Sequence, residues 1–289
     1  MDELDSMVAF TRRNKTYRDL HEPLTELQRM VGMTRLKLSI VSQIKFLIAN
    51  NGTLDDHFLN TSISGPPGTG KTSVARILFN IWNAMGIFKN KDRAFHILHR
   101  SDFVGSYMGH TSNKTKKMLQ KHAGNVLFID EAYSLVTGDR DEYGQEALHQ
   151  LNSFMSEEKS NTIVIIAGYE DDLEEKFYKC NQGLKRRFGW HFVVEPYSAH
   201  ELYKIFLQQL KKNGWTVEEC EQLFVHNKEK FVNAGGDCEN IAFKAKLEYS
   251  KRVWNKKKKT KQLTVADVKS GFDEHFVYKK DSIESTMYI

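Results

Sequence analysis

Two hydrophobic patterns alternate along the first two thirds of the chain. Five short apolar runs predict strands at residues 57–64, 94–100, 125–130, 161–168 and 190–195. Around and between them, apolar residues three and four positions apart predict helices at residues 24–50, 73–86, 113–123 and 144–157. Because the strands are apolar on both faces and helices alternate with them, we expect a parallel five-stranded sheet flanked by helices. Ligands of such sheets bind at the carboxyl ends of the strands.

The pattern changes after Glu195 and Pro196, where the strands stop. Helical spacing predicts helices at residues 199–214, 221–236 and 240–254. A fourth helix is expected from Thr264, because Asp267 stands three residues later, as in a capping box. We therefore expect an N-terminal arm or short helix at residues 1–23, an α/β domain at 24–196, a small all-helical domain at 197–280 and a tail at 281–289.

Composition narrows the class of protein. The 289 residues are 40% hydrophobic and 27% charged, which is ordinary for a soluble globular protein. No stretch approaches the length of a membrane span, and the N-terminus has no apolar leader. Cys180, Cys220 and Cys238 are widely spaced and match no metal pattern, so we expect a cytoplasmic protein without a membrane partner. Much of the net charge of +5 lies in residues 256–261, KKKKTK, a run that usually indicates a solvated loop and less often nucleic-acid binding.

A glycine-rich segment between a predicted strand and a predicted helix carries the first chemical signal. Residues 65–72, GPPGTGKT, fit the pattern G-x-x-x-x-G-K-[ST] at every position. Glycine lets backbone N–H groups curl round a polyphosphate, and the following helix points its first N–H groups at the same anion. A flexible turn is the alternative, which the flanking strand and helix disfavour. We expect ATP to be held by Pro67, Gly68, Thr69, Gly70, Lys71, Thr72 and Ser73, with Lys71 at the β- and γ-phosphates and Thr72 on Mg²⁺.

The second signal is a pair of acids at the end of an apolar strand, NVLFIDE. Asp130 and Glu131 follow the predicted strand at residues 125–130, and burying adjacent carboxylates is costly without a cation. A solvated strand end or a helix cap is the alternative. Beside a phosphate loop, we expect Asp130 to bind Mg²⁺ and Glu131 to polarise the water that attacks the γ-phosphate.

These motifs resemble the AAA+ ATPases. The segments SDFVGSYMGHTSNKTKKML, IDEAYSL, VIIAGYEDDLEEKF and NQGLKRRF narrow the resemblance to the CbbX/SpoVK branch, which includes the red-type rubisco activases. It extends over about residues 24–272 and is most specific in the first two thirds. The resemblance implies a ring, usually a hexamer, with ATP held between neighbours and a central pore whose loops grip a polypeptide.

The resemblance assigns further residues. Tyr107, in Tyr-Met-Gly, matches the pore loop, with simple packing as the alternative. Arg187, preferred over Arg186, matches the arginine finger that a neighbouring subunit extends to the γ-phosphate, with a surface basic cluster as the alternative. Val31 and Gly32 match backbone that lies against adenine.

Two positions depart from the broader family. Tyr169 stands where the sensor-1 residue is more usually Asn or Thr. It either takes the sensor-1 role or only packs at the end of the strand. Glu239 stands where a sensor-2 arginine is expected, which puts the lid's contact with the γ-phosphate in doubt. Lys244, one turn onward, is a candidate substitute, but neither residue is counted as a site.

The predicted function is an ATP-hydrolysing AAA+ ring motor that remodels or threads a protein client, with Lys71, Glu131 and Arg187 as its catalytic residues. Two alternatives stay open. The lysine run favours a nucleic-acid motor or loader, and the missing sensor-2 arginine favours a nucleotide-dependent scaffold with slow turnover. The sequence does not identify the client.

Overall fold

A computed structural model describes residues 2–50, 59–88, 93–105, 109–138, 140–157, 162–257 and 259–286. The predicted pore-loop residue Tyr107 lies outside the described residues. The chain forms two compact units: Met1–Gly65 with Lys71–Glu195, and Pro66–Gly70 with Pro196–Ile289. We call them the α/β unit and the helical unit. Of the helices described, none has the length and apolar character needed to cross a membrane.

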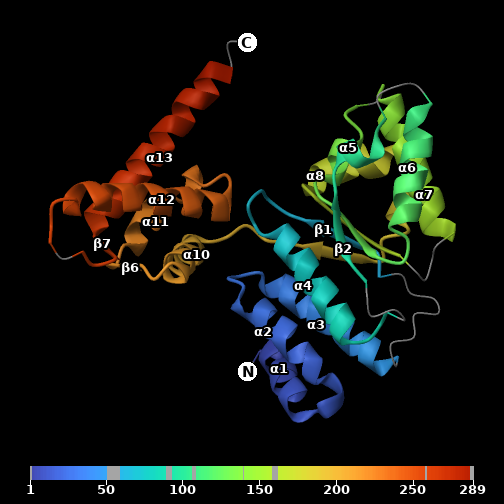
Figure 1. The fold of residues 1–289 in the computed structure, drawn as a ribbon, viewed down its shortest axis with the longest axis horizontal. Coiled ribbons are helices and arrows are strands. Elements are labelled where there is room, and N and C mark those ends of the chain that lie inside the picture. The colour runs from blue at the N-terminus through green and yellow to red at the C-terminus, as the bar shows by residue number, and fades with distance from the viewer. Residues whose placement is uncertain are drawn as a thin grey trace. The chain divides into compact units, whose positions relative to one another are not determined.

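The α/β unit contains the predicted five-stranded parallel sheet (Figure 1). Its strand order is β2-β3-β4-β1-β5. The strands are β1 Thr61–Ser64, β2 Phe95–Leu98, β3 Val126–Ile129, β4 Ile163–Gly168 and β5 Trp190–Val193. The longer helices are α1 Glu3–Arg13, α2 His21–Arg29, α3 Thr34–Ala49, α4 Lys71–Ala84, α6 His110–Lys121 and α7 Glu142–Glu157. The short turns of helix are η1 Lys15–Leu20, α5 Arg100–Phe103, η2 Ala132–Leu135, α8 Glu170–Asp172, the π-helix η3 Leu173–Tyr178 and α9 Gln182–Lys185.

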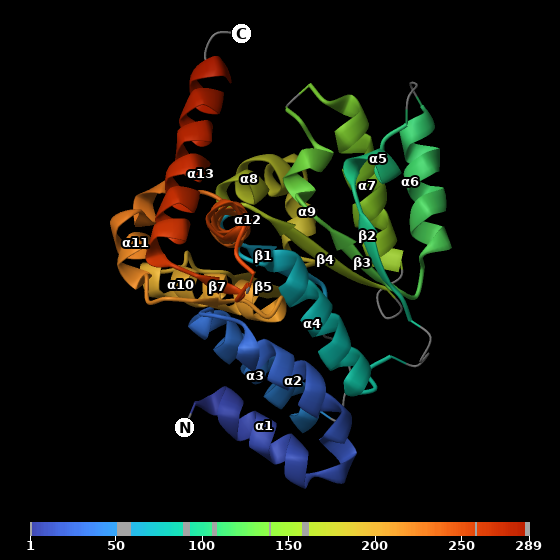
Figure 2. The same cartoon turned by 60° about the vertical axis from the view of Figure 1, so that its left-hand side comes forward.

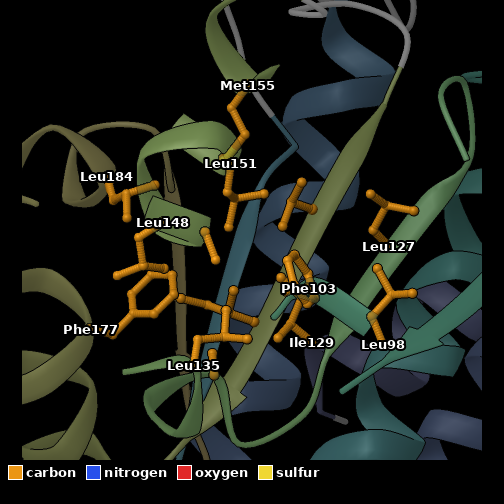
Figure 3. Packing of buried hydrophobic residues seen from close by; sticks show 14 of the residues in the cluster. Leu98, Phe103, Leu127, Ile129, Leu135, Leu148, Leu151, Met155, Phe177 and Leu184 are labelled. Atoms are coloured by element: carbon orange, nitrogen blue, oxygen red, sulfur yellow. The ribbon is translucent and has the colours of Figure 1, made fainter. Parts of the chain in front are cut away.

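Helices cover both faces of this sheet, which explains why the strands are apolar throughout. On one face, Leu127 and Ile129 of β3 belong to a buried cluster with Leu148 and Leu151 of α7 (Figure 3). Phe128, which lies between Leu127 and Ile129 in β3, points to the other face of the sheet. Its ring stacks on that of Phe95, and the Phe95 ring contacts Phe79 of α4. Alternate residues therefore bury into two layers, as strands of period two require.

The first residues of the chain, where the sequence predicts an arm or a short helix, pack onto the α/β unit. Helix α1 buries Leu4, Met7 and Val8, and Leu20 of η1 is fully buried. Lys45 of α3 pairs with Glu3 at 2.8 Å.

The helical unit contains α10 Ala199–Lys212, α11 Glu221–His226, η4 Lys228–Lys230, α12 Ala234–Val253 and α13 Val265–Thr286 (Figure 2). The predicted capping box is present: the Asp267 N–H donates to Thr264 Oγ1, and the Thr264 N–H donates to Asp267 Oδ2. A parallel two-stranded ladder of β6 Thr216–Val217 and β7 Gln262–Leu263 was not expected in an all-helical part.

The single helix predicted at residues 221–236 is wrong. α11 ends at His226, and α12 begins at Ala234. The Asp237 carboxylate accepts hydrogen bonds from the N–H groups of Val232 and Asn233 at 2.9 and 2.7 Å, and these bonds replace the helical partners that those groups would need.

Candidate active site

The glycine-rich segment begins at the end of β1 with Gly65. Its φ is +152°, and a Cβ there would lie 2.6 Å from the Val194 carbonyl oxygen, so no other residue fits. The Gly65 carbonyl accepts a hydrogen bond at 2.9 Å from Nζ of Lys71, the first residue of α4. Burial lowers the pKa of the Lys71 ammonium, while the nearby Asp130 and Glu131 carboxylates act to raise it. The lysine is thus held at the end of the strand next to two acids.

The residues between them, Pro66–Gly70, belong to the helical unit. The Gly68 carbonyl accepts from the Gly235 N–H at 3.1 Å, and the Thr69 carbonyl accepts from the Tyr197 hydroxyl at 2.9 Å. Gly68 has φ +66°, and a Cβ there would lie 1.9 Å from the Asn233 carbonyl oxygen. Asn233 and Tyr197 were not expected from the sequence, because neither belongs to a motif.

Three other residues expected to hold the polyphosphate are Pro67, Gly70 and Ser73. Gly70 has φ +89°, a conformation that favours glycine. Pro67 is partly buried, and Ser73 is exposed in the first turn of α4.

Thr72 and Asp130, the two predicted Mg²⁺ ligands, lie side by side. Thr72 Oγ1 donates a hydrogen bond to Asp130 Oδ2 at 2.9 Å, which joins the start of α4 to the end of β3. Mg²⁺ prefers oxygen ligands and usually takes one or two carboxylates, with water and substrate phosphate completing its shell. A hydroxyl and a carboxylate oxygen this close therefore fit the ion.

Glu131 follows in a conformation that is rare for a non-glycine residue. Its φ and ψ are 49° and 49°, and its side chain is exposed. Left-handed backbone costs roughly 1–2 kcal/mol in such a residue, and strain of this kind concentrates at functional sites. The Glu131 N–H donates to Asp130 Oδ1 at 3.1 Å, so the backbone at Glu131 helps to hold the Asp130 carboxylate.

Two tyrosines lie beside these acids. The Lys71 Nζ is 5.1 Å from the ring centroid of Tyr169, and Tyr169 stacks on Tyr133 with centroids 5.4 Å apart. Burial raises the pKa of the Tyr133 hydroxyl, and Glu131 and Tyr169 raise it further. The resemblance pointed to Tyr169. Tyr133 was missed, although its place two residues after Glu131 was a usable signal.

An ion pair fixes the segment that follows Glu131. Arg100 pairs with Asp141 at 2.8 Å and donates to the carbonyl oxygens of Ser134 and Leu135. Burial alone would raise the pKa of Asp141, but Arg100 and the N–H of Thr137 outweigh it and hold that pKa well below its usual range.

The two arginines of the predicted finger differ in surroundings. Arg187 is partly buried and its Nε donates to Asn152 Oδ1 at 2.6 Å. Arg186 is exposed and lines a cavity with Lys179 and Lys185.

The predicted adenine contact, Val31 and Gly32, forms a tight turn before α3. Gly32 and Met33 both have left-handed φ values, +65° and +57°, and Met33 is buried. Val31 and Gly32 are themselves partly buried.

The sensor-2 region lies at the start of α12. Glu239 is exposed there. Lys244 Nζ donates to the Glu274 carbonyl oxygen of α13 at 2.9 Å, so the candidate substitute is engaged within the helical unit.

Comparisons with known proteins identify the family of the chain. The family model "ATPase family associated with various cellular activities (AAA)" matches residues 61–189. The chain is 33% identical to "Protein CfxQ homolog" of Galdieria sulphuraria, over 82% of this chain and 81% of that protein. It is 35% identical to the protein of that name from Pyropia yezoensis, over 83% of this chain and 76% of the relative. "Putative cfxQ-like protein R730" of Acanthamoeba polyphaga mimivirus is 30% identical over 91% of this chain, which spans 66% of that relative.

Solved structures show the same fold at low identity. A RuvB mutant from Thermotoga maritima matches with a TM-score of 0.61 at 16% identity, covering 86% of this chain and 71% of that one. The FIGL-1 AAA domain in complex with ADP matches with a TM-score of 0.55 at 17% identity, covering 86% of this chain and 79% of that one.

Proposed function

The chain belongs to the AAA family of ATPases, in the branch of the CfxQ homologs. From that premise we propose that it is one subunit of a six-membered ring that remodels or threads a protein client. It binds nucleotide and hydrolyses ATP, as its family does. The observation that best supports the proposed site is the contact of Thr72 with Asp130, which joins the glycine-rich segment to the acidic strand end.

In the proposed site, residues 65–72 hold the polyphosphate through backbone N–H groups, and Ser73 follows in the same helix turn. Lys71, held at the end of β1 by the Gly65 carbonyl, exchanges that contact for phosphate oxygens. Thr72 and Asp130 would hold Mg²⁺, which when bound neutralises charge on the phosphates. Val31 and Gly32 would lie against the adenine.

Glu131 is proposed to orient the attacking water. Its backbone has the strained left-handed conformation and its side chain is exposed, so water can reach the carboxylate. Arg187 of a second copy is proposed to stabilise the charge that forms on the γ-phosphate. One site then draws on two copies, so assembly is required for activity.

The proposed client is a polypeptide gripped by Tyr107, a residue outside the described part of the chain. An aromatic side chain binds unfolded chain of many sequences through apolar contact. ATP-driven domain movement would pull the client along the pore.

A mixing experiment tests the shared site. Lys71→Ala and Arg187→Ala should each abolish ATP turnover alone. Mixed in equal amounts, they should recover about a quarter of wild-type activity, because random head-to-tail assembly joins an intact pocket to an intact finger at about one contact in four. Arg186→Ala is the matched control and should stay active. If sedimentation shows that both variants assemble and the mixture still recovers no ATP turnover, a shared site would be contradicted.

The nucleic-acid motor is the second candidate, because the described lysines of residues 256–261 are exposed. A protein motor should turn over ATP faster with an unfolded protein, and a nucleic-acid motor with DNA or RNA. The slow scaffold is the third candidate, supported by Glu239 in place of an arginine, and wild-type turnover as slow as that of Glu131→Gln would favour it.

A further inference from the structure

One end of the helical unit carries a strong positive charge that the proposed ATPase site does not use. Residues 246–261 contain seven lysines, one arginine and one glutamate. That glutamate, Glu248, pairs with Lys251, and Arg252 pairs with Asp267. Among the described residues, Lys256, Lys257 and Lys259 make no ion pair and are exposed. Their charge is therefore available to an outside partner.

The segment that carries these lysines is tied to the unit at its far end. The Tyr249 hydroxyl donates to the Thr260 carbonyl, and the Lys261 carbonyl accepts from the Thr216 N–H at 2.8 Å in the β6–β7 ladder. Lys261 Nζ donates to the Asn213 carbonyl, just after Lys211 and Lys212 at the end of α10. The end of the lysine run at Lys261 is thus held close to Lys211 and Lys212.

Exposed aromatic side chains lie beside this charge. Trp254, directly after α12, is 74% exposed and Phe243 is 60% exposed. The backbone of Trp254 is still helical, with φ −54° and ψ −38°, so helical spacing aligns its side chain with Phe243, eleven residues and about 16 Å away along the helix axis, with the exposed Leu247 between them. The opposite face of α12 is buried through Ile241, Ala245 and Tyr249. A tryptophan side chain is usually mostly buried, so an exposed indole directly before a run of lysines suggests a contact with a partner.

Lysines on both sides of the aromatic line complete the surface. Helical spacing places Lys246 on one flank of the Phe243–Trp254 line and Lys251 on the other. The Lys246 Nζ also lies 5.7 Å from the ring centroid of Trp215, and this cation–π contact helps to hold the Lys246 side chain in place. We name the surface formed by Phe243, Lys246, Trp254, Lys256, Lys257 and Lys259 the basic track.

We propose that the basic track binds single-stranded nucleic acid, with its lysines on the phosphates and Trp254 stacked on an unpaired base. A line of aromatic faces flanked by positive charge is what sequence-independent single-strand binding uses. Duplexes keep their bases stacked inside, so they offer phosphates to the lysines and nothing to the indole. The basic track lies wholly within the helical unit, and the proposal does not depend on the client of the motor.

The test is equilibrium binding of a fluorescent oligo(dT) of twenty nucleotides to the full chain, with excess ADP present to occupy the phosphate loop. Trp254→Ala should weaken binding about 10-fold, as expected for one stacked base, and Trp254→Phe should restore most of it. Because Trp254 is exposed, these variants should keep the wild-type melting temperature. Equal affinity for the Ala variant and the wild type would overturn the proposal.

The lysines are tested by salt dependence. A fourfold rise in salt should lower wild-type affinity about 50-fold if about four phosphates are contacted. The triple variant Lys256→Gln, Lys257→Gln, Lys259→Gln should lower the slope of log affinity against log salt by about 2. The matched control removes three exposed lysines of α6, Lys116→Gln, Lys117→Gln and Lys121→Gln, and should keep the wild-type slope.

Two other classes of partner are tested with the same chain, and tighter binding of either one would overturn the proposal. Vesicles with 30% phosphatidylserine test an anionic membrane, and polyglutamate tests an acidic protein. Binding of either one through Trp254 more tightly than oligo(dT), or binding of a duplex as tightly as of the single strand, would contradict single-strand recognition. Preference for oligo(dT) over all three would support it.

Discussion

The hydroxyl of Thr72 donates a hydrogen bond to the carboxylate of Asp130 at 2.9 Å, across 58 positions of sequence. This contact fixes the start of α4 against the end of β3, because Thr72 is the second residue of α4 and Asp130 directly follows β3. Thr72→Val keeps the shape of the side chain and removes the hydroxyl, so ATP turnover should fall about 100-fold, as when a single electrostatic contact of a catalytic site is lost. Thr72→Ser should retain activity. Turnover measured against Mg²⁺ concentration checks both, and a Val variant as active as the Ser variant would contradict the assignment.

Tyr169 is expected to stabilise Lys71 in its charged form. A cation over an aromatic ring contributes about 0.5–2 kcal/mol, which corresponds to roughly 2- to 30-fold in nucleotide affinity. Tyr169→Leu should weaken nucleotide binding within that range, while Tyr169→Phe, which keeps the ring over the Lys71 Nζ, should bind as the wild type does. Titration with a fluorescent ATP analogue measures the difference. If Phe and Leu weaken binding equally, the hydroxyl and not the ring is what matters.

Asp141 should contribute to stability at neutral pH and lose that contribution in acid. Its pKa is held well below the usual range, so the folded state favours the charged carboxylate. A carboxyl with a lowered pKa stabilises the fold above its unfolded pKa, near 4, and the effect is lost as pH falls below it. Asp141→Asn should cost about 1.5–3 kcal/mol at pH 7, the range for hydrogen bonds to a charged group, and less at pH 3.

Chemical denaturation of the wild type and the Asn variant at both pH values measures this difference. Asp171→Asn, an exposed carboxylate of α8, is the control and should change little. A cost for Asp141→Asn that stays constant between pH 7 and pH 3 would show that the charge is unimportant.

Gly68 is expected to tolerate no side chain. Gly68→Ala places a Cβ 1.9 Å from the Asn233 carbonyl in addition to the cost of a left-handed φ. Gly214→Ala is a matched control, since Gly214 has φ +70° and open space around its Cβ position. Gly214→Ala should lower stability by about 1–2 kcal/mol, and Gly68→Ala should lower it by clearly more. Equal loss in the two variants would mean that the loop moves away from Asn233.

The sheet could be predicted because residues such as Leu127 and Phe128 bury on opposite faces, which produces continuous apolar runs. The turn between α11 and α12 could not, because Asp237 reaches back to two backbone N–H groups that periodicity treats as helical. The ladder of β6 and β7 was missed because two residues in each strand are too few to set a pattern.

The proximity of the motif residues could be predicted, while their roles in a nucleotide site stay a prediction. Lys71, Thr72, Asp130 and Glu131 were expected together from spacing, and in the structure Thr72 bonds to Asp130 while Lys71 lies near both acids. The stacking of Tyr133 on Tyr169 joins two strand ends that are distant in sequence, so no local pattern contains it.

The most direct measurement is ATP turnover and ATP binding by Glu131→Gln beside the wild type. The account predicts that the Gln variant binds ATP with wild-type affinity and loses turnover at least about 100-fold, because an amide cannot polarise the attacking water. A Gln variant that hydrolyses ATP at the wild-type rate would contradict the account.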